Sequence, residues 1–129
     1  MSNILSTIES FKRKKSTGGI EKSIISKAEK ELAVTFASEY KLLLSNYGFL
    51  YVKGEEFLGI DIASYDVVKA TKEARQNFND FPAGMYVVEN FAIDGILLLQ
   101  KASGEVYTYQ PNENLKQIAS NLDEYLSNL

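Results

Sequence analysis

The sequence contains neither cysteine nor histidine. Without cysteine the chain cannot form disulfides, and it offers no thiolate nucleophile, which is compatible with a reducing compartment. Without histidine it lacks the commonest general base and the commonest metal ligand. Triads of the Ser-His-Asp or Cys-His type are therefore excluded, and we expect a protein that works without metal or cofactor.

Long hydrophobic runs are also missing. The longest apolar run, residues 95–99, is as long as a strand, whereas a membrane-spanning helix needs about 20 apolar residues. The basic residues near the N-terminus follow the apolar ones, which is the reverse of a secretory signal. We therefore expect a cytoplasmic protein with no membrane partner.

The composition is typical of one globular domain. Of the 129 residues, 45% are hydrophobic and 24% are charged. A chain of this length buries roughly two-thirds of its unfolded surface, enough for a core of its own. The net charge of −3 neither requires a basic partner nor excludes an acidic one. The sequence predicts a single domain over residues 1–129.

One run of like charge, Lys-Arg-Lys-Lys at residues 12–15, precedes a Ser-Thr-Gly-Gly segment. Basic runs can mark nucleic-acid contact, but this one lacks interleaved aromatic residues and is followed by no phosphate-loop spacing. It is more typical of a solvated helix end, where cations suit the helix dipole. We therefore expect residues 1–19 to form a helix and a flexible joint, with no direct nucleic-acid binding.

Apolar residues at helical spacing predict five helices. Gly48 is expected to cap the third helix in a left-handed conformation, and Ser64 is expected to cap the fourth. The last helix has two possible starts, because its apolar stripe extends back to Leu115 while Ser120–Asp123 reads as a capping box. The expected helices cover residues 4–11, 20–32, 36–47, 64–78 and either 115–129 or 120–129.

Runs of strand-forming residues separated by glycine turns predict five strands. Lys53-Gly54 is expected to close a hairpin, and the continuous apolar run at residues 96–99 is typical of a strand covered on both faces. Clustered strands with short turns indicate an α+β fold, with a mainly antiparallel sheet against which helices pack. The expected strands are residues 49–53, 56–60, 85–90, 95–100 and 105–109.

The order of these elements resembles the SUKH superfamily, which contains yeast regulators of cell-wall glucan assembly and many bacterial immunity proteins. Its hallmark is an apolar-acidic helix, a Leu-Pro, a Tyr- and Leu-containing helix that ends in Tyr-Gly-Gly, and then a hairpin. The stretch "IEKSIISKAEKELAVTFASEYKLLLSNYGF" looks like this hallmark, and "SGEVYTY" and "IASNLDEYLSNL" resemble the family's late strand and closing helix. The resemblance covers residues 20–129. The matching positions are Ile20, Ala28, Glu29, Leu32, Tyr40, Leu44, Tyr47, Gly48, Gly59, Gly104 and Val106.

Three positions depart from the family pattern. Phe36-Ala37 replaces the usual Leu-Pro, and Tyr109 replaces a tryptophan. Phe49 replaces the second glycine, so it needs an ordinary backbone angle at the entry to the hairpin. The resemblance assigns this segment a scaffold role, namely turning from a helix into the sheet and holding a groove beside the hairpin.

The resemblance implies a non-enzymatic immunity protein that binds a cognate bacterial toxin stoichiometrically, with a nuclease domain as the expected target. An inhibitor of a basic nuclease site would present carboxylates and aromatic side chains, which would also speed association. Each of these side chains also has a plain structural reading, as a solvated charge or as packing. The candidate partner-binding residues are Tyr51, Glu55, Glu56, Asp61, Tyr65, Glu89 and Asp94.

Other function classes remain as alternatives. A regulatory adaptor of the cell-wall-assembly type would use the same surface. An enzyme is disfavoured because Glu55 and Glu56, as neighbours in a strand, point to opposite faces. Asp61 and Asp66 lack the spacing of a calcium loop. We expect no small-molecule substrate, and a nucleic-acid binder would rest on residues 12–15 alone.

Overall fold

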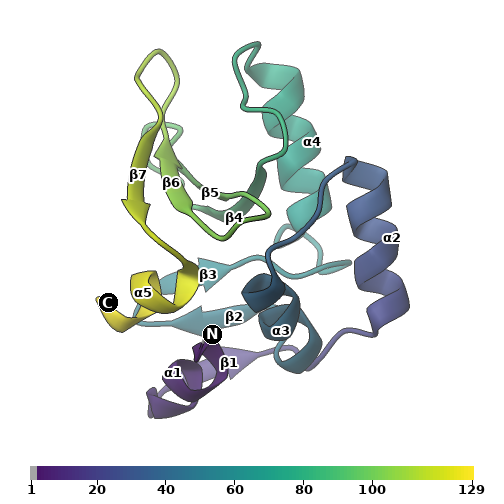
Figure 1. Cartoon of the computed structure of the whole chain (residues 1–129), viewed down its shortest axis with the longest axis vertical. Helices are drawn as coiled ribbons and strands as arrows, with labels where there is room; N and C mark the ends of the chain where they lie inside the picture. Colours follow the sequence, from purple (N-terminus) through teal and green to yellow (C-terminus); the bar gives the residue numbers. More distant parts are fainter. Residues whose placement is uncertain (1–2) are drawn as a thin grey trace.

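A computed structural model describes residues 3–129, and these form one α+β domain, as the sequence predicted (Figure 1). The helices are α1 (Ile4–Ser10), α2 (Lys22–Leu32), α3 (Ser38–Asn46), α4 (Val67–Asn77) and α5 (Leu122–Ser127). The strands are β1 (Lys14–Ser16), β2 (Leu50–Val52), β3 (Glu55–Phe57), β4 (Tyr86–Asn90), β5 (Leu97–Gln100), β6 (Val106–Tyr109) and β7 (Lys116–Ala119).

The strands form two antiparallel sheets, whereas the sequence suggested one. Within residues 3–129, one sheet has the order β1-β2-β3 and the other has the order β4-β5-β6-β7. The sheets meet just after β3, where Leu58 donates its backbone N–H to the carbonyl oxygen of Val88 in β4 at 2.9 Å. This junction leaves β1 at the edge of one sheet and β7 at the edge of the other.

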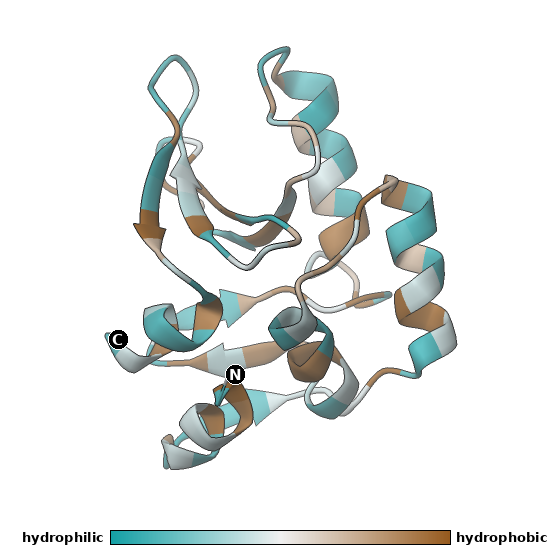
Figure 2. Ribbon diagram, in the orientation of Figure 1, coloured by the Kyte–Doolittle hydropathy of each residue, from teal (hydrophilic) through white to brown (hydrophobic). Residues whose placement is uncertain are grey.

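One hydrophobic core lies between the helices and the sheets. The apolar faces of the helices point inward and their polar faces point outward (Figure 2). At the centre, the rings of Phe36, Tyr40 and Tyr86 pack with centroid separations of 4.7, 5.2 and 5.4 Å. The central strand β5 is buried on both faces, which confirms the prediction from its continuous apolar run.

The passage from α3 into the first hairpin also confirms the prediction. Gly48 adopts a left-handed φ of 69° just past the helix, and Phe49 has no positive φ. Lys53 and Gly54 have φ values of 52° and 80°, so a two-residue turn with both φ angles positive closes the β2–β3 hairpin. The chain therefore changes direction at Gly48 and at Lys53-Gly54, as the sequence predicted.

The prediction for residues 12–15 was wrong. Helix α1 ends at Ser10, and β1 pairs antiparallel with β2 where a helix end was expected. The two glycines that follow form a close crossing where a flexible joint was expected. A Cβ on Gly19 would lie 2.1 Å from the carbonyl oxygen of Ser45, and Ile20 donates its N–H to Leu44 at 2.9 Å. Glycine at this position therefore allows the segment before α2 to pack directly against the backbone of α3.

Three boundaries also differ from the sequence prediction. Asp66, and not Ser64, caps α4, because its carboxylate accepts the N–H of Val68 at 2.8 Å. Asn121 caps α5, so the later of the two predicted starts of the C-terminal helix, at residue 120, is nearly right. The residues that might have extended that helix form β7, which pairs with β6 and whose first residues are exposed. A period-2 pattern is too weak to see in such a short edge strand.

Candidate functional site

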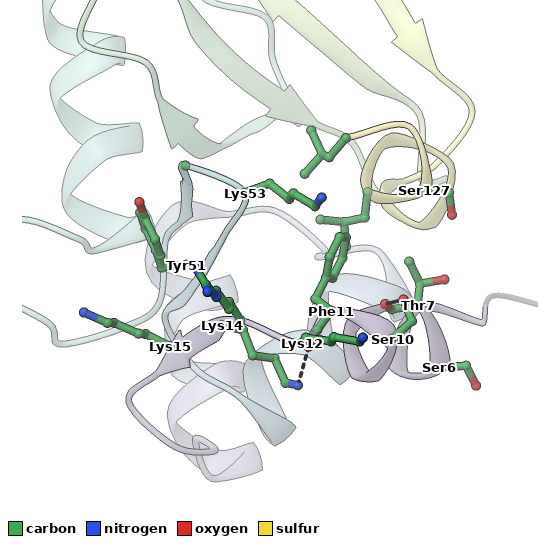
Figure 3. Close-up of a pocket in the computed structure, with 14 residues that line it drawn as sticks. Ser6, Thr7, Ser10, Phe11, Lys12, Lys14, Lys15, Tyr51, Lys53 and Ser127 are labelled. Carbon is green, nitrogen blue, oxygen red and sulfur yellow. Dashed lines mark hydrogen bonds between the residues drawn. The ribbon is translucent and has the colours of Figure 1, made fainter.

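A surface hollow of about 1340 Å³ lies between α1, β1, the β2–β3 turn and the end of α5 (Figure 3). We call it the basic groove because five of its lining side chains are cationic. These are Lys12, Arg13, Lys14, Lys15 and Lys53. All five are exposed, and no Asp or Glu is among the described residues that line the hollow.

The charges of the basic groove are not balanced by ion pairs. The ion pairs found within residues 3–129 lie elsewhere, between Lys41 and Glu29, Lys72 and Glu31, and Lys101 and Glu105. Inside the groove, Lys14 donates its ammonium to the carbonyl oxygen of Phe11 at 3.0 Å, which restrains the side chain without neutralising it. The groove is therefore a concentration of positive charge on a chain of net charge −3.

Strand pairing brings these cations together. The β1–β2 register places Lys14 opposite Val52 and Lys15 opposite Tyr51. Lys53, which opens the turn after β2, consequently comes next to a basic run that is distant in sequence. Sequence reasoning noted the run but not this neighbour, because the pairing depends on a strand that the sequence did not reveal.

The groove also has an apolar component. Phe11 follows α1, and Leu126 and Leu129 come from the C-terminal end of the chain. Tyr51, a residue that is 38% exposed, contributes an aromatic ring. Cations beside apolar surface can bind a ligand that carries both negative charge and hydrophobic groups.

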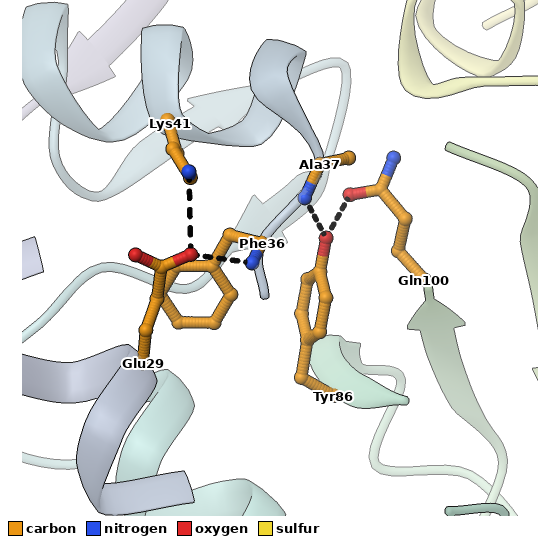
Figure 4. A network of polar contacts seen from close by, with 6 residues as sticks. All are labelled: Glu29, Phe36, Ala37, Lys41, Tyr86 and Gln100. Carbon is orange, nitrogen blue, oxygen red and sulfur yellow. Dashed lines mark hydrogen bonds and ion pairs between the residues drawn. The ribbon is translucent and has the colours of Figure 1, made fainter. Parts of the chain in front are cut away.

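Beneath the surface, a polar network joins α3, β4 and β5 (Figure 4). The Tyr86 hydroxyl accepts the N–H of Ala37 at 2.8 Å and donates to Gln100 Oε1 at 2.8 Å. Gln100 Nε2 in turn donates to the Gly104 carbonyl at 2.9 Å and to Glu39 Oε2 at 3.1 Å. Burial raises the pKa of the Tyr86 hydroxyl, so this group stays neutral as a paired donor.

Glu39 ends this network at the first turn of α5. Its carboxylate is only 3% exposed and accepts the N–H groups of Leu122 at 2.8 Å and Asp123 at 3.0 Å. A carboxylate at a helix N-terminus satisfies free donors and complements the helix dipole. Burial raises the pKa of Glu39, and these hydrogen bonds oppose that rise. Glu39 therefore fixes α5 to α3.

Glu29 has a related role at the start of α3. It accepts the backbone N–H of Phe36 at 2.7 Å and pairs with Lys41 at 3.4 Å (Figure 4). This contact holds the link between α2 and α3 where the family usually has Leu-Pro. Glu29, the acidic residue of α2 that matches the family hallmark, therefore has a structural role.

A second carboxyl group is buried at the junction of the sheets. Glu89 of β4 is 3% exposed, and its Oε2 accepts the N–H of Glu56 at 3.2 Å. Burial, followed by the neighbouring Glu55 carboxylate, raises the pKa of Glu89 to about 9. Glu55 accepts the Tyr125 hydroxyl at 2.5 Å. Glu89 and Tyr125 thus both face Glu55, and this cluster joins α5 to the sheets.

The structure does not gather the predicted partner-binding residues into one acidic surface. Tyr51 lines the basic groove, and Glu55 and Glu89 belong to the buried cluster described above. Tyr65, 36% exposed, packs against the Phe49 ring at a centroid distance of 4.7 Å. The remaining members lie apart, Glu56 half-buried in β3, Asp61 exposed after β3 and Asp94 exposed in the β4–β5 turn.

The family-motif residues occupy structural positions. Tyr40 is fully buried and donates to the Leu58 carbonyl at 2.7 Å, and Val106 is also fully buried. A Cβ on Gly59 would lie 2.8 Å from the backbone nitrogen of Phe49, so the hairpin needs glycine there. Of the others, Tyr47 is half-buried beside α3, Gly48 caps that helix, and Gly104 accepts from Gln100.

Sequence reasoning missed Glu39, Gln100 and the groove cations as a group. A signal for Glu39 was present, because it precedes the buried Leu43 by four residues and so lies on the apolar side of its helix. Gln100 ends a buried apolar run and had no comparable signal. Among residues 3–129, no helix is both long and apolar enough to span a membrane, and no three carboxylates group as metal ligands would.

Comparison with known proteins gives one family. The SMI1-KNR4 cell-wall family model, SUKH_5, matches residues 1–129, so the match includes the N-terminal segment that the resemblance had left out. No curated protein matches the chain.

Proposed function

Because the chain belongs to the SUKH superfamily, which includes both toxin-immunity proteins and SMI1/KNR4-type members, we propose that it is a non-enzymatic immunity protein. In this proposal it binds a cognate bacterial toxin in the producer's cytoplasm and blocks it stoichiometrically. The expected target is a nuclease domain. The exposed cations differ from the carboxylates expected from the sequence, so they would face acidic side chains of the partner, such as metal-binding carboxylates, and not a basic site. Members of this family generally act by binding other proteins and do not catalyse reactions.

The observation that supports a binding role is the basic groove. Five exposed cations that form no ion pair among residues 3–129 repel one another, and a protein with 17 acidic residues could have neutralised them internally. Charge of one sign around an apolar floor is typical of a surface that a complementary partner covers. By contrast, the buried carboxyl groups Glu39 and Glu89 hold elements together and do not line the groove.

Co-expression with a toxin encoded by the adjacent gene tests this proposal. The expected result is restored growth of the toxin-expressing host and a complex of one toxin to one inhibitor on light scattering. The Lys22→Ala variant carries an exposed substitution on α2 and should protect equally well. Unrestored growth with a well-folded protein, and no complex, would contradict the immunity function.

A regulatory adaptor is the second candidate, because SMI1/KNR4-type members belong to the same family. It predicts a stable complex with a host cell-envelope enzyme and no effect on any toxin. Genomic neighbourhood separates the two functions, since an adjacent toxin gene favours immunity and an isolated gene favours the adaptor.

A further inference from the structure

We propose that the edge of β1 binds an extended acidic segment of the partner, which adds to the first sheet as a fourth strand. This inference rests on the proposed binding function and names the surface and the partner chemistry. The order of that sheet would become segment-β1-β2-β3. The partner's carboxylates would lie against the cations of the basic groove.

The position of the hollow supports strand addition. Neighbouring residues of a strand point to opposite faces of the sheet. Lys14 and Lys15 are neighbours in β1, yet both line the groove (Figure 3). The hollow takes in side chains from both faces of β1 and also Lys53 and Gly54 of the adjacent turn, so it lies around the N-terminal part of this edge strand.

The backbone of β1 is oriented for this pairing. Thr17 donates its N–H to the Phe49 carbonyl at 3.3 Å, so it forms a hydrogen-bonded pair with β2. Such pairs alternate along an antiparallel ladder, so Lys15 also faces β2. The N–H and C=O groups of Lys14 and Ser16 therefore point away from β2, toward the open edge of the sheet, and Lys14 also lines the groove. They are the groups that an added strand would pair with.

The side chains determine what kind of strand fits. Lys14, Lys15 and Lys53 surround the edge, so carboxylates along the segment would be neutralised on binding. The partly exposed side chains of Phe11 and Leu129 offer an apolar contact within the groove. The best match is a segment in which acidic residues predominate and a few apolar residues alternate with them.

A nucleic acid is the competing polyanion, and the structure favours it less. The chain has a net charge of −3 and a pI near 5.0, so its overall field opposes every polyanion, and it opposes most strongly a phosphate backbone that carries a charge on each nucleotide. The groove exposes Tyr51 as a stacking surface, whereas single-strand binders stack successive bases on several aromatic rings. The open strand edge presents carbonyl oxygens beside its N–H groups, and these carbonyl oxygens can pair with a peptide backbone but not with phosphate oxygens.

The first test uses fluorescence anisotropy with a labelled peptide of about ten residues, a normal strand length, in which glutamate alternates with valine and threonine. A lysine-for-glutamate peptide and a single-stranded oligonucleotide serve as comparison probes. The triple variant Lys14→Ala/Lys15→Ala/Lys53→Ala should bind the acidic peptide about tenfold more weakly than the wild type. The matched control is Lys22→Ala/Lys30→Ala/Lys69→Ala, which removes equal charge from exposed sites outside the groove and should bind normally.

A second variant tests the backbone. Ser16→Pro removes an N–H that points away from β2, along the open edge of the sheet, and leaves the hydrogen bonds to β2; edge strands tolerate proline. We expect about fivefold weaker peptide binding from the loss of one hydrogen bond, with Ser16→Ala unchanged. Thermal unfolding of both variants verifies that the fold is intact.

The inference is overturned if the acidic peptide binds no better than the basic one, or if both groove variants bind it as the wild type does. Preferential binding of the oligonucleotide would replace it with a nucleic-acid site. Toxin neutralisation by the Lys14/Lys15/Lys53 and Ser16→Pro variants separates the two proposals. If these variants protect fully, the toxin does not bind at the groove, and the immunity function itself is not contradicted. If the wild type binds the acidic peptide but does not protect the host from the toxin, the immunity function is rejected and the strand-addition site is retained.

Discussion

At the scale of single residues, Glu39 illustrates how a buried charge can be a structural part. Its two oxygens receive three hydrogen bonds, from two backbone amides of α5 and from the Gln100 side chain. Removing the carboxylate would leave the buried Leu122 amide and the partly buried Asp123 amide without this acceptor, and Gln100 Nε2 would keep only its bond to Gly104. The cost of leaving buried donors unpaired is larger than the net gain of making the bonds.

Replacing Glu39 with alanine should therefore lower the free energy of unfolding by about 2–4 kcal/mol, because it removes the acceptor of two backbone amides of α5. Urea unfolding at neutral pH measures this loss. Glu73→Ala, at an exposed position of α4, is the matched control and should change stability little. Equal losses in the two variants would contradict the capping role.

Glu89 predicts a dependence of stability on pH. Its pKa rises from an ordinary value of 4.5 to about 9 in the folded state, so the native protein binds more protons than the unfolded chain between these values. The stability that the protonated group contributes is complete below the unfolded pKa and is lost as pH rises through the folded pKa.

The Glu89→Gln variant stays neutral and should lose less stability over this range. At high pH it should exceed the wild type by at least about 1 kcal/mol, because a buried ionised oxygen without a partner is costly. Urea unfolding at several pH values checks this, with the exposed Glu113→Gln as control. Parallel curves for Glu89→Gln and the wild type would refute the assignment.

At the scale of elements, the turn from α3 into the first hairpin depends on glycine for two separate reasons. Gly48 and Gly54 both have positive φ, at 69° and 80°. A Cβ on Gly48 would also lie 2.4 Å from the Gly18 carbonyl oxygen, whereas a Cβ on Gly54 would meet nothing within 4 Å. Conformational strain acts at both positions, and steric conflict acts at one.

We expect Gly54→Ala to cost about 1–2 kcal/mol from backbone strain alone. Gly48→Ala should cost roughly 3 kcal/mol or more, because the overlap is added to that strain. Chemical unfolding of the two variants measures the difference between them. Similar losses would mean that the Gly18 backbone moves away freely.

Elements with strong local signals were predicted, and elements defined by their neighbours were not. The apolar stripes of α2, α3 and α4 and the turn at Lys53-Gly54 are properties of the sequence itself. The strands β1 and β7 are short and largely exposed, so they carry no apolar alternation and exist through pairing with β2 and β6. The same reason explains why the basic groove escaped prediction, since its cations converge only through that pairing.

At the scale of the whole molecule, the N-terminal segment belongs to the core. Ile4 and Ile8 of α1 are fully buried, and α1 packs against α3 and α5. The family-like core was predicted to begin at residue 20, yet the apolar contacts of the described chain begin earlier. Residues before that boundary therefore contribute to the stability of the whole domain.

Ile8→Ala should lower the free energy of unfolding by about 2–5 kcal/mol through the cavity that it leaves. Ile24→Ala makes the same change at a helical position that is 37% exposed, and it should cost less than about 1 kcal/mol. Thermal or urea unfolding compares the two. A small loss for Ile8→Ala would show that α1 is dispensable to the core.

The first and last helices are joined directly, since Asn3 donates its backbone N–H to Asp123 at 3.3 Å and the Thr7 hydroxyl also bonds that carboxylate. Both ends of the described chain thus leave the domain beside the basic groove, which α1 and the end of α5 line (Figure 1). An affinity tag or fluorescent fusion at either end would stand next to this surface and could block it. A label in the exposed turn at Ile93–Asp94, which does not line the groove, would report on partner binding without that obstruction.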